Sequence, residues 1–457
     1  MSNGALPPQP QRSSIFAGLL LIFLGALFLL HRYIPELGIG HLIARYWPVL
    51  LIIWGIAKLV DHLSAQRTGH ARPPVLSGGE AVLLVLLVVV LGWIWVVDYI
   101  HMKHPQLEVD GIGLFSHRHS DMEVIPPQSI PAGAQVTVQT GHGDLTIHAG
   151  DMNEIRVEVN KSGSAPNESS ARKQLKEVRV VIEHSGSAYL VHPVSQDQAS
   201  GNVSVDLDVE LPKNVSLTAT SARGDIKISG IGGAITATTQ NGDVEIHDAG
   251  SDVNVQLQKG DVRVADVTGS VRITGKGSQI DVSDVAGDAL LEGDFFGPIR
   301  VRNVKKTTHY ASQRSDITLL HLTGQLELDS GDIEISDVAG SARITTHNQD
   351  MDIENIAGKL DVTNAHGDIK VRCSDPPRED INVVNDSGEI DLTLPSNSSF
   401  QIAASSRSGE VQSDFEDASL KLANESDTGH LNGTVGSHGS RITLTTSYGT
   451  IYLRKSS

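Results

Sequence analysis

A short motif repeats through the middle of this 457-residue chain and limits its possible folds more than any other feature. Gly-Asp followed by alternating apolar residues begins at Gly224, Gly242, Gly260, Gly331 and Gly367, and the first three copies are 18 residues apart. Weaker copies begin at Ser278, Gly297, Ser315 and Gln349. A repeat at near-constant spacing predicts stacked units, none of which can bury its apolar face alone.

A second set of glycine-led strands lies between these copies, beginning at Gly233, Gly269, Gly287, Gly324, Gly340 and Gly358. Each unit is thus about nine residues, a strand and a turn, and two units make one coil. Alternation places Ile226 and Ile228 on one face and Lys227 on the other. We predict a two-sheeted β-solenoid with about 18 residues per coil over residues 221–375. A sandwich of antiparallel hairpins is the alternative, because Gly-Asp turns also close hairpins.

The flanking regions alternate less regularly. Residues 106–220 predict a β-rich domain with strands near residues 135, 144, 155, 178 and 203, interrupted by one helix at 168–176. Asp375-Pro-Pro breaks the period, and residues 376–457 predict an irregular β continuation that caps the solenoid. A cap is expected because an open end exposes a row of unpaired backbone amides.

The N-terminal part predicts a membrane region. Residues 1–14 are rich in Pro, Gln and Ser and predict a disordered tail. Residues 15–105 contain three apolar runs that predict transmembrane helices at about 15–34, 43–60 and 80–99. The alternatives are a cleaved signal peptide for the first run and a re-entrant or interfacial hairpin for the second.

Charge supports an orientation and excludes one class of partner. If the N-terminus is inside, four basic residues of the loops face the cytoplasm: Arg12, Lys58, Arg67 and Arg72. Three basic residues face the other side: Arg32, Arg45 and Lys103. This predicts a multi-pass protein of the cell membrane whose all-β residues 106–457 are extracytoplasmic. The chain's net charge of −18 argues against nucleic acid as a partner.

Two groups of residues raise a metal hypothesis. The turn aspartates, Asp225, Asp243, Asp261, Asp316, Asp332, Asp350 and Asp368, would form a column in a solenoid. We expect them to accept backbone N–H bonds in the turns, with a calcium column as the alternative. His117, His119 and Asp121 would point to one side of a strand and suit zinc or copper, but a solvated juxtamembrane linker is the favoured interpretation and no metal site is predicted.

No catalytic residue and no cofactor is predicted. Cys373, the single cysteine, has no evident activating partner, and neither a nucleophile elbow nor a phosphate loop is found. Paired carboxylates in so acidic a chain leave a carbohydrate-active β-helix enzyme as an alternative.

Two stretches resemble known bacterial families. Trp47-Pro-Val-Leu-Leu-Ile-Ile-Trp-Gly55, after a first span with Gly18 and Gly25, resembles the transmembrane module of LiaI/LiaF-like envelope proteins. Residues 130–457, best at Val209 to Ile228, are similar to a bacterial adhesin-like family of β-strand repeats, a domain of unknown function. The resemblance implies a bacterial envelope protein and establishes no catalytic or ligand residue.

These observations predict a non-enzymatic, membrane-anchored envelope protein that displays an acidic β-solenoid for protein or envelope contacts. The first alternative is a LiaF-like modulator whose partner is an envelope-stress sensor kinase. The carbohydrate-active enzyme is the second.

Overall fold

The computed structural model of the chain describes residues 117–165, 168–195, 203–329, 331–425, 427–437 and 439–456. The chain divides into two compact units, residues 1–118 with 164–171 and residues 119–163 with 172–457, and most described residues belong to the second. The predicted tail and the three predicted spans lie outside the described residues. Within the described ranges, no helical segment combines the length and hydropathy needed for a membrane crossing.

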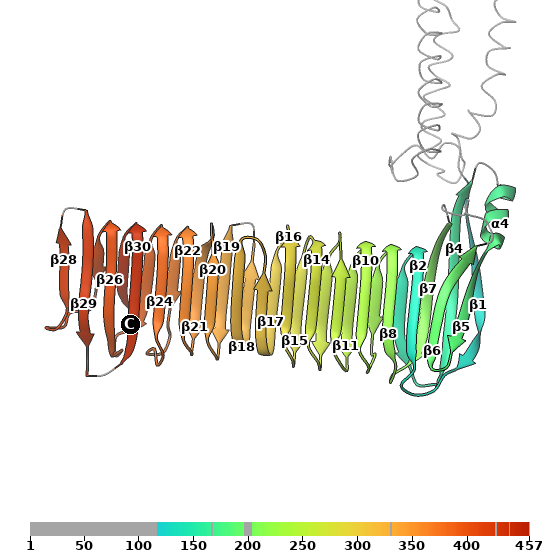
Figure 1. Cartoon of the computed structure of the whole chain (residues 1–457), viewed down its shortest axis with the longest axis horizontal. Coiled ribbons are helices and arrows are strands. Elements are labelled where there is room, and N and C mark those ends of the chain that lie inside the picture. Colours follow the sequence, from blue (N-terminus) through green and yellow to red (C-terminus); the bar gives the residue numbers. More distant parts are fainter. Residues whose placement is uncertain are drawn as a thin grey trace, which may run out of the picture. The chain divides into compact units, whose positions relative to one another are not determined.

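Parallel strands in two stacks form the centre of the second unit (Figure 1). The first sheet contains β8 (Ser216–Arg223), β10 (Ile235–Asn241), β12 (Val253–Leu257), β14 (Val271–Gly277) and β16 (Ala289–Phe295). The second contains β9 (Ile226–Ser229), β11 (Val244–Ala249), β13 (Val262–Val267), β15 (Ile280–Val285) and β17 (Ile299–Ala311). The chain visits the sheets alternately, so that each pair of strands makes one coil. We call this stack, including its extensions at both ends, the solenoid.

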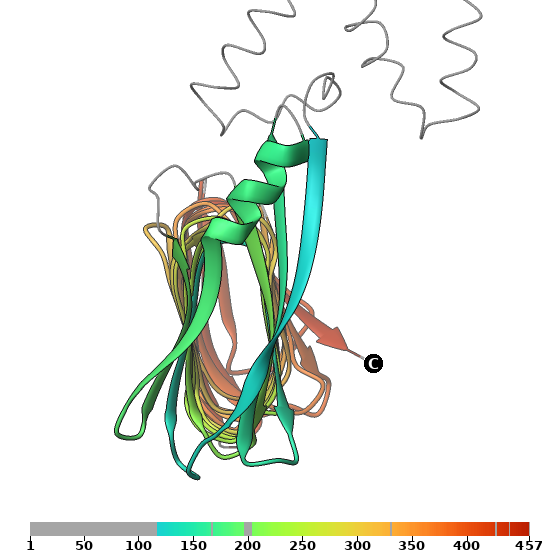
Figure 2. The same cartoon turned by 90° about the vertical axis from the view of Figure 1, so that its right-hand side faces the viewer.

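The register confirms the solenoid prediction. Val244 lies opposite Ile226 on one side and opposite Val262 on the other, and both neighbours are 18 residues away in sequence. The first sheet keeps the same offset, with Ile235 opposite Val253. Viewed along the stack, the coils superpose as a narrow two-sided loop (Figure 2). The antiparallel-hairpin alternative is therefore wrong for these coils.

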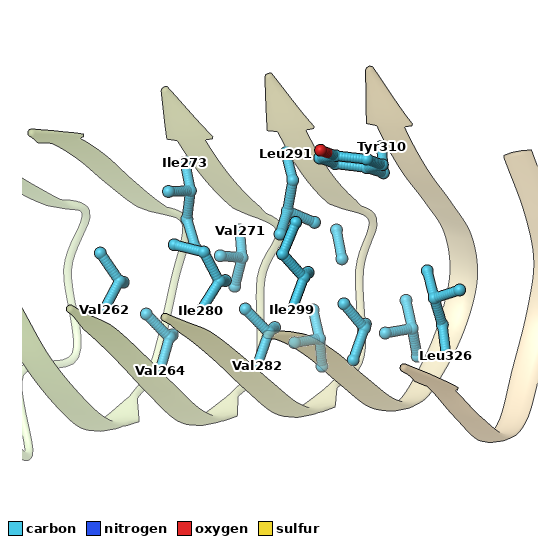
Figure 3. Close-up of a cluster of buried hydrophobic side chains, with 14 of the residues drawn as sticks. Val262, Val264, Val271, Ile273, Ile280, Val282, Leu291, Ile299, Tyr310 and Leu326 are labelled. Carbon is cyan, nitrogen blue, oxygen red and sulfur yellow. The ribbon is translucent and has the colours of Figure 1, made fainter. Parts of the chain in front are cut away.

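The core lies between the two sheets and runs through consecutive coils (Figure 3). Val262 and Val264 of the second sheet and Val271 and Ile273 of the first point into it, and each is at most 1% exposed. Burying one such side chain contributes about 1.5–3 kcal/mol. The inward aliphatic rows therefore contribute strongly to holding neighbouring coils together.

One strand in the middle runs the opposite way. After β17 the chain turns back as β18 (Ser315–Leu328), which pairs antiparallel with β17 and then with both β19 (Asp332–Val338) and β20 (Ala342–Thr346). Two reversals cancel, so the following strands continue in the original direction. They are β21 (Asp350–Ile356), β22 (Leu360–His366), β23 (Ile369–Arg372), β24 (Ile381–Ser387) and β25 (Ile390–Pro395).

This reversal corrects part of the repeat assignment. The copy at Ser315 was expected in the second sheet, but Asp316 lies opposite Thr345 of β20, in the first. The copy at Gly324 was expected in the first sheet, but Leu326 lies opposite Ile335 of β19, in the second. An antiparallel strand traverses the two sheets in the opposite order, which exchanges the sheets to which the two copies belong.

Both ends of the solenoid contain a coil that is out of sequence order. At the N-terminal end, β2 (Gln135–His142) and β3 (Leu145–Gly150) lie between β8 and β9 on one side and β6 (Ala188–Ser195) and β7 (Val203–Pro212) on the other. The strands β4 (Glu154–Ala165) and β5 (Val178–Ser185) then pair antiparallel with β7 and β6. The strand β1 (His117–Ser129) pairs with β4, and the predicted helix is present as α4 (Glu168–Glu177).

At the C-terminal end the last coil of the chain is inserted inside the stack. Its strands β30 (Ser440–Tyr448) and β31 (Ile451–Ser456) lie between β24 and β25 on one side and β26 (Phe400–Ser408) and β27 (Val411–Ser413) on the other. An antiparallel hairpin of β29 (Thr428–Val435) and β28 (Lys421–Glu425) follows β26 in the first sheet.

Candidate contact faces of the solenoid

The outer face of the second sheet carries charges that alternate in sign from coil to coil. Along one row the register brings together Lys227, Glu245, Arg263, Asp281 and Arg300. Neighbouring strands are about 4.8 Å apart, so every charge of this row after Lys227 lies between opposite charges. Arg302 contacts Asp281 at 2.8 Å, and Arg300 contacts Glu327 at 2.8 Å. Hydrogen bonding to Glu327 raises the pKa of Arg300. Alternating signs and these two ion pairs therefore leave little net charge along this row.

The outer face of the first sheet carries no charged residue at the central outward positions of four neighbouring strands, β2 (Gln135–His142), β8, β10 and β12. Its two outward rows carry hydroxyl and carboxamide side chains, which we call the threonine face: Thr137, Thr218, Thr236 and Asn254, and Gln139, Thr220, Thr238, Gln256 and Thr274. The face ends where Arg272 and Glu292 form an ion pair at 3.2 Å. Parallel strands without a shift in register hold these groups at the regular strand spacing. The face is thus a flat, neutral array of hydrogen-bonding groups.

The turn aspartates bind the backbone of the next coil. Asp225 Oδ1 accepts the backbone N–H of Asp243 at 2.8 Å, and Asp243 Oδ1 accepts that of Asp261 at 2.8 Å. The same bond joins Asp144 to Asp225, Asp261 to Gln279, Asp350 to Asp368, and Asp368 to Glu389. The expected turn role is confirmed for these residues. A small cleft of about 220 Å³ runs beside Asp225, Asp243 and Asp261.

Two aspartates of the predicted column depart from this pattern. Asp316 lies in the first sheet, as described above. Asp332 lies opposite Asp350, but the backbone N–H of Asp350 donates to Gly331 O at 2.9 Å. The column is therefore interrupted at the antiparallel strand.

The candidate metal ligands lie on β1. His119 is half-buried and Asp121 is exposed, while the placement of the His117 side chain is outside the description. Within the described part of the chain, no group of three or more His, Cys, Asp or Glu side chains is arranged to hold a metal ion. The metal interpretation of these three residues stays a hypothesis.

A buried lysine next to β1 was missed by the sequence reasoning. Lys161 on β4 is 3% exposed, and its Nζ donates to Glu123 Oε2 at 2.7 Å and to Val178 O at 3.2 Å. In the alternating pattern of β4, Lys161 falls on the same inward face as Ile155, Val157 and Val159. This position in the pattern could have predicted that Lys161 is buried.

The single cysteine is partly buried after β23. Burial raises the pKa of the Cys373 thiol to about 11, so the thiol is protonated at neutral pH. The thiolate is the nucleophilic form. The position therefore disfavours a nucleophilic role.

Several solved bacterial structures are similar to this chain. A proposed cell adhesion protein from Clostridium sporogenes ATCC 15579 is 9% identical, with 74% of this chain and 100% of that chain covered and a TM-score of 0.17. A proposed adhesin from Bacteroides fragilis NCTC 9343 is 11% identical, with 73% and 97% covered and a TM-score of 0.17. A proposed lipid-binding protein from Parabacteroides distasonis ATCC 8503 is 12% identical, with 76% and 99% covered and a TM-score of 0.16.

Family comparisons cover most of the sequence. No curated protein matches the chain. Residues 15–59 match the LiaI-LiaF-like transmembrane region. Residues 134–454, which include nearly all of the solenoid, match the family described as Toastrack DUF4097. The chain therefore belongs to the Toastrack DUF4097 family.

Proposed function

We propose that this chain is a non-enzymatic, membrane-anchored protein of a bacterial envelope that uses its solenoid for contacts with proteins or other envelope components. The proposal includes three membrane spans, at 15–34, 43–60 and 80–99, and places residues 106–457 outside the cytoplasm. It also includes the division of the extracytoplasmic part at residues 106, 221 and 376. The match of residues 15–59 to a transmembrane family supports the anchor.

The threonine face is the observation that carries the proposal. Charges of opposite sign alternate along the opposite face, where Asp281 and Arg300 form ion pairs, and the turn carboxylates are engaged with the backbone of the next coil. The threonine face instead presents neutral donors and acceptors in a regular array toward the outside. Such an array is suited to a neutral partner with repeated hydrogen-bonding groups, because charged partners gain little from it.

Binding to envelope material tests this role. We expect Thr218→Lys, Thr236→Lys and Thr238→Lys together to abolish co-sedimentation of the protein with isolated envelope fractions. The matched control places three lysines on the outer row of the second sheet, at Ser229, Ala265 and Ser283. Both variants must keep the thermal unfolding midpoint of the parent. Equal loss of binding in both variants, or retention in the first, contradicts the threonine face as the contact surface.

Protease treatment of intact cells tests the orientation. We expect added protease to release solenoid fragments while a cytoplasmic marker stays whole. Cleavage only after the cytoplasmic membrane itself is broken, and not after an outer membrane is permeabilised, would place the solenoid inside the cytoplasm and contradict the proposal.

The match to the LiaI-LiaF-like region also favours a second candidate, a modulator of an envelope-stress sensor kinase. Deleting residues 1–105 separates the two functions. A displayed binder keeps its partner in a pull-down, whereas a regulator that contacts the kinase within the membrane loses it.

A further inference from the structure

The C-terminal end of the solenoid leaves one sheet edge open. The outermost strand of the first sheet is β28, which lies at the far end of the stack (Figure 1) and pairs only with β29 among the described strands. All five of its residues are exposed. An unpaired edge presents a row of backbone donors and acceptors to any strand of suitable shape.

The second sheet ends differently. Its last strand, β27, is covered by a side chain, because Asn424 Oδ1 accepts the N–H of Val411 and its Nδ2 donates to the carbonyl of the same residue, both at 3.1 Å. The amide of Asn424 thus occupies the place of a neighbouring strand. The open edge at this end belongs to the first sheet.

The core is also incompletely closed at this end. A shallow groove of about 480 Å³ is lined by Phe415, Leu420, Leu422 and Leu431. Leu422 on β28 is 51% exposed, although its cross-strand neighbour Leu431 on β29 is 1% exposed. An apolar side chain on the inner face of an end strand is covered only if the stack continues.

The sequence of β28 is complementary to itself. In a full-length antiparallel pairing of two copies, Ala423 lies opposite Ala423, Leu422 opposite Asn424, and Lys421 opposite Glu425. A two-fold axis at Ala423 therefore gives two symmetry-related pairs of Lys421 with Glu425. Opposite charges that lie directly across antiparallel strands stabilise the pair.

We propose that two copies of this chain join end to end through β28, centred on Ala423. The axis is perpendicular to the first sheet, so the first sheets of both copies become continuous and their inner faces stay on the same side. The two grooves then face each other, and each copy covers the Leu422 side of the other. The interaction is independent of the function proposed for the threonine face.

Disulfide trapping tests the pairing. Opposite residues at the centre of an antiparallel pair lie about 4.5–5.5 Å apart, within reach of a disulfide. We expect full-length Cys373→Ala/Ala423→Cys protein in detergent to form disulfide-linked dimers under mild oxidation. The control is Cys373→Ala/Ala357→Cys, which places a cysteine at an exposed alanine far from β28. Equal crosslinking of the two variants, or crosslinking of the cysteine introduced on β28 to a different protein in membranes, overturns the proposal.

Charge reversal tests the register in the same crosslinking background. Lys421→Glu alone and Glu425→Lys alone each place like charges opposite one another, and we expect the dimer yield of each to fall about fivefold or more. Mixing the two single variants restores attraction in both pairs and should restore the yield, as should the double variant. Misfolding cannot imitate this recovery. Yields that ignore the charge changes overturn the pairing.

Discussion

Aspartate has two separate uses in the turns of this protein, and both depend on its short side chain. In the Gly-Asp turns, the carboxylate accepts a backbone N–H from the next coil, as Asp243 does from Asp261 at 2.8 Å. At the end of the second-sheet strands, just before the other turn of the coil, Asp248 and Asp266 adopt the left-handed conformation, with φ of 55° and 57°. Asp and Asn tolerate this conformation better than other residues with a side chain. The first use joins coils, and the second bends the chain within a coil.

The inter-coil bond gives a prediction at Asp243. We expect Asp243→Ala to lower the free energy of unfolding by about 0.5–1.5 kcal/mol, because the N–H of Asp261 loses its protein acceptor. Asp243→Asn keeps an acceptor oxygen and should cost clearly less. Urea unfolding of both variants measures the difference. Millimolar calcium should leave the parent midpoint unchanged, and a calcium-dependent rise that disappears in Asp243→Asn would support the calcium column instead.

At the C-terminal end of the solenoid, the folding of β26 and β27 depends on strands that come later in the chain. Among the described strands, the coil of β26 and β27 has parallel partners only in β30 and β31, which come later in the chain. The strands β24 and β25 lie on the other side of the same inserted coil. The final segment of the chain, which begins at Ser440, therefore connects the end of the stack to the rest.

Truncation tests this dependence. We expect removal of residues 440–457 to leave residues 396–439 sensitive to limited proteolysis, because their parallel partners are missing. Removal of residues 396–457 leaves β24 and β25 as the terminal coil and should unfold at an equal or higher temperature than the shorter truncation. Persistent protection of residues 400–435 in the shorter truncation would show that the hairpin cap folds without the inserted coil.

The solenoid as a whole is held by contacts between successive coils, so its stability is close to a sum over coils. Each coil repeats the same inward positions, as Ile226, Val244 and Val262 do. Removing one whole coil preserves the register of every remaining strand. Removing half a coil instead moves every later strand into the other sheet.

Deletion of whole and half coils tests this property. We expect deletion of Asp243–Gly260 to give a folded protein, because Gly242 then joins Asp261 and the Gly-Asp turn is preserved. The new contact between Lys227 and Arg263 should cost about 0.2–1 kcal/mol. Lys227→Glu should recover this cost, because the neighbour of Lys227 on the other side is the uncharged Thr146. Deletion of Gly242–Gly250 should abolish cooperative unfolding in circular dichroism. Similar melting of both deletions would show that coils are not the unit of folding.

The alternation of single residues determined much of this architecture without reference to any tertiary contact. The 18-residue spacing specified which residues stack, and the inward phase specified the core, because a strand's side chains alternate with period two whatever lies beside it. The same phase marked Lys161, although only the structure shows its partner Glu123. Which residues form the threonine face also follows from the phase of the first-sheet strands.

Tertiary structure decided the direction of β18, the insertion of the terminal coils, and hence the open edge at β28. Local alternation is the same for parallel and antiparallel strands, so it carries no information on direction. Likewise, a strand inserted from the end of the chain makes the same hydrogen bonds as its sequence neighbour would. Strand order is set by which backbone edge is free when the segment pairs, and that is a property of the folded molecule.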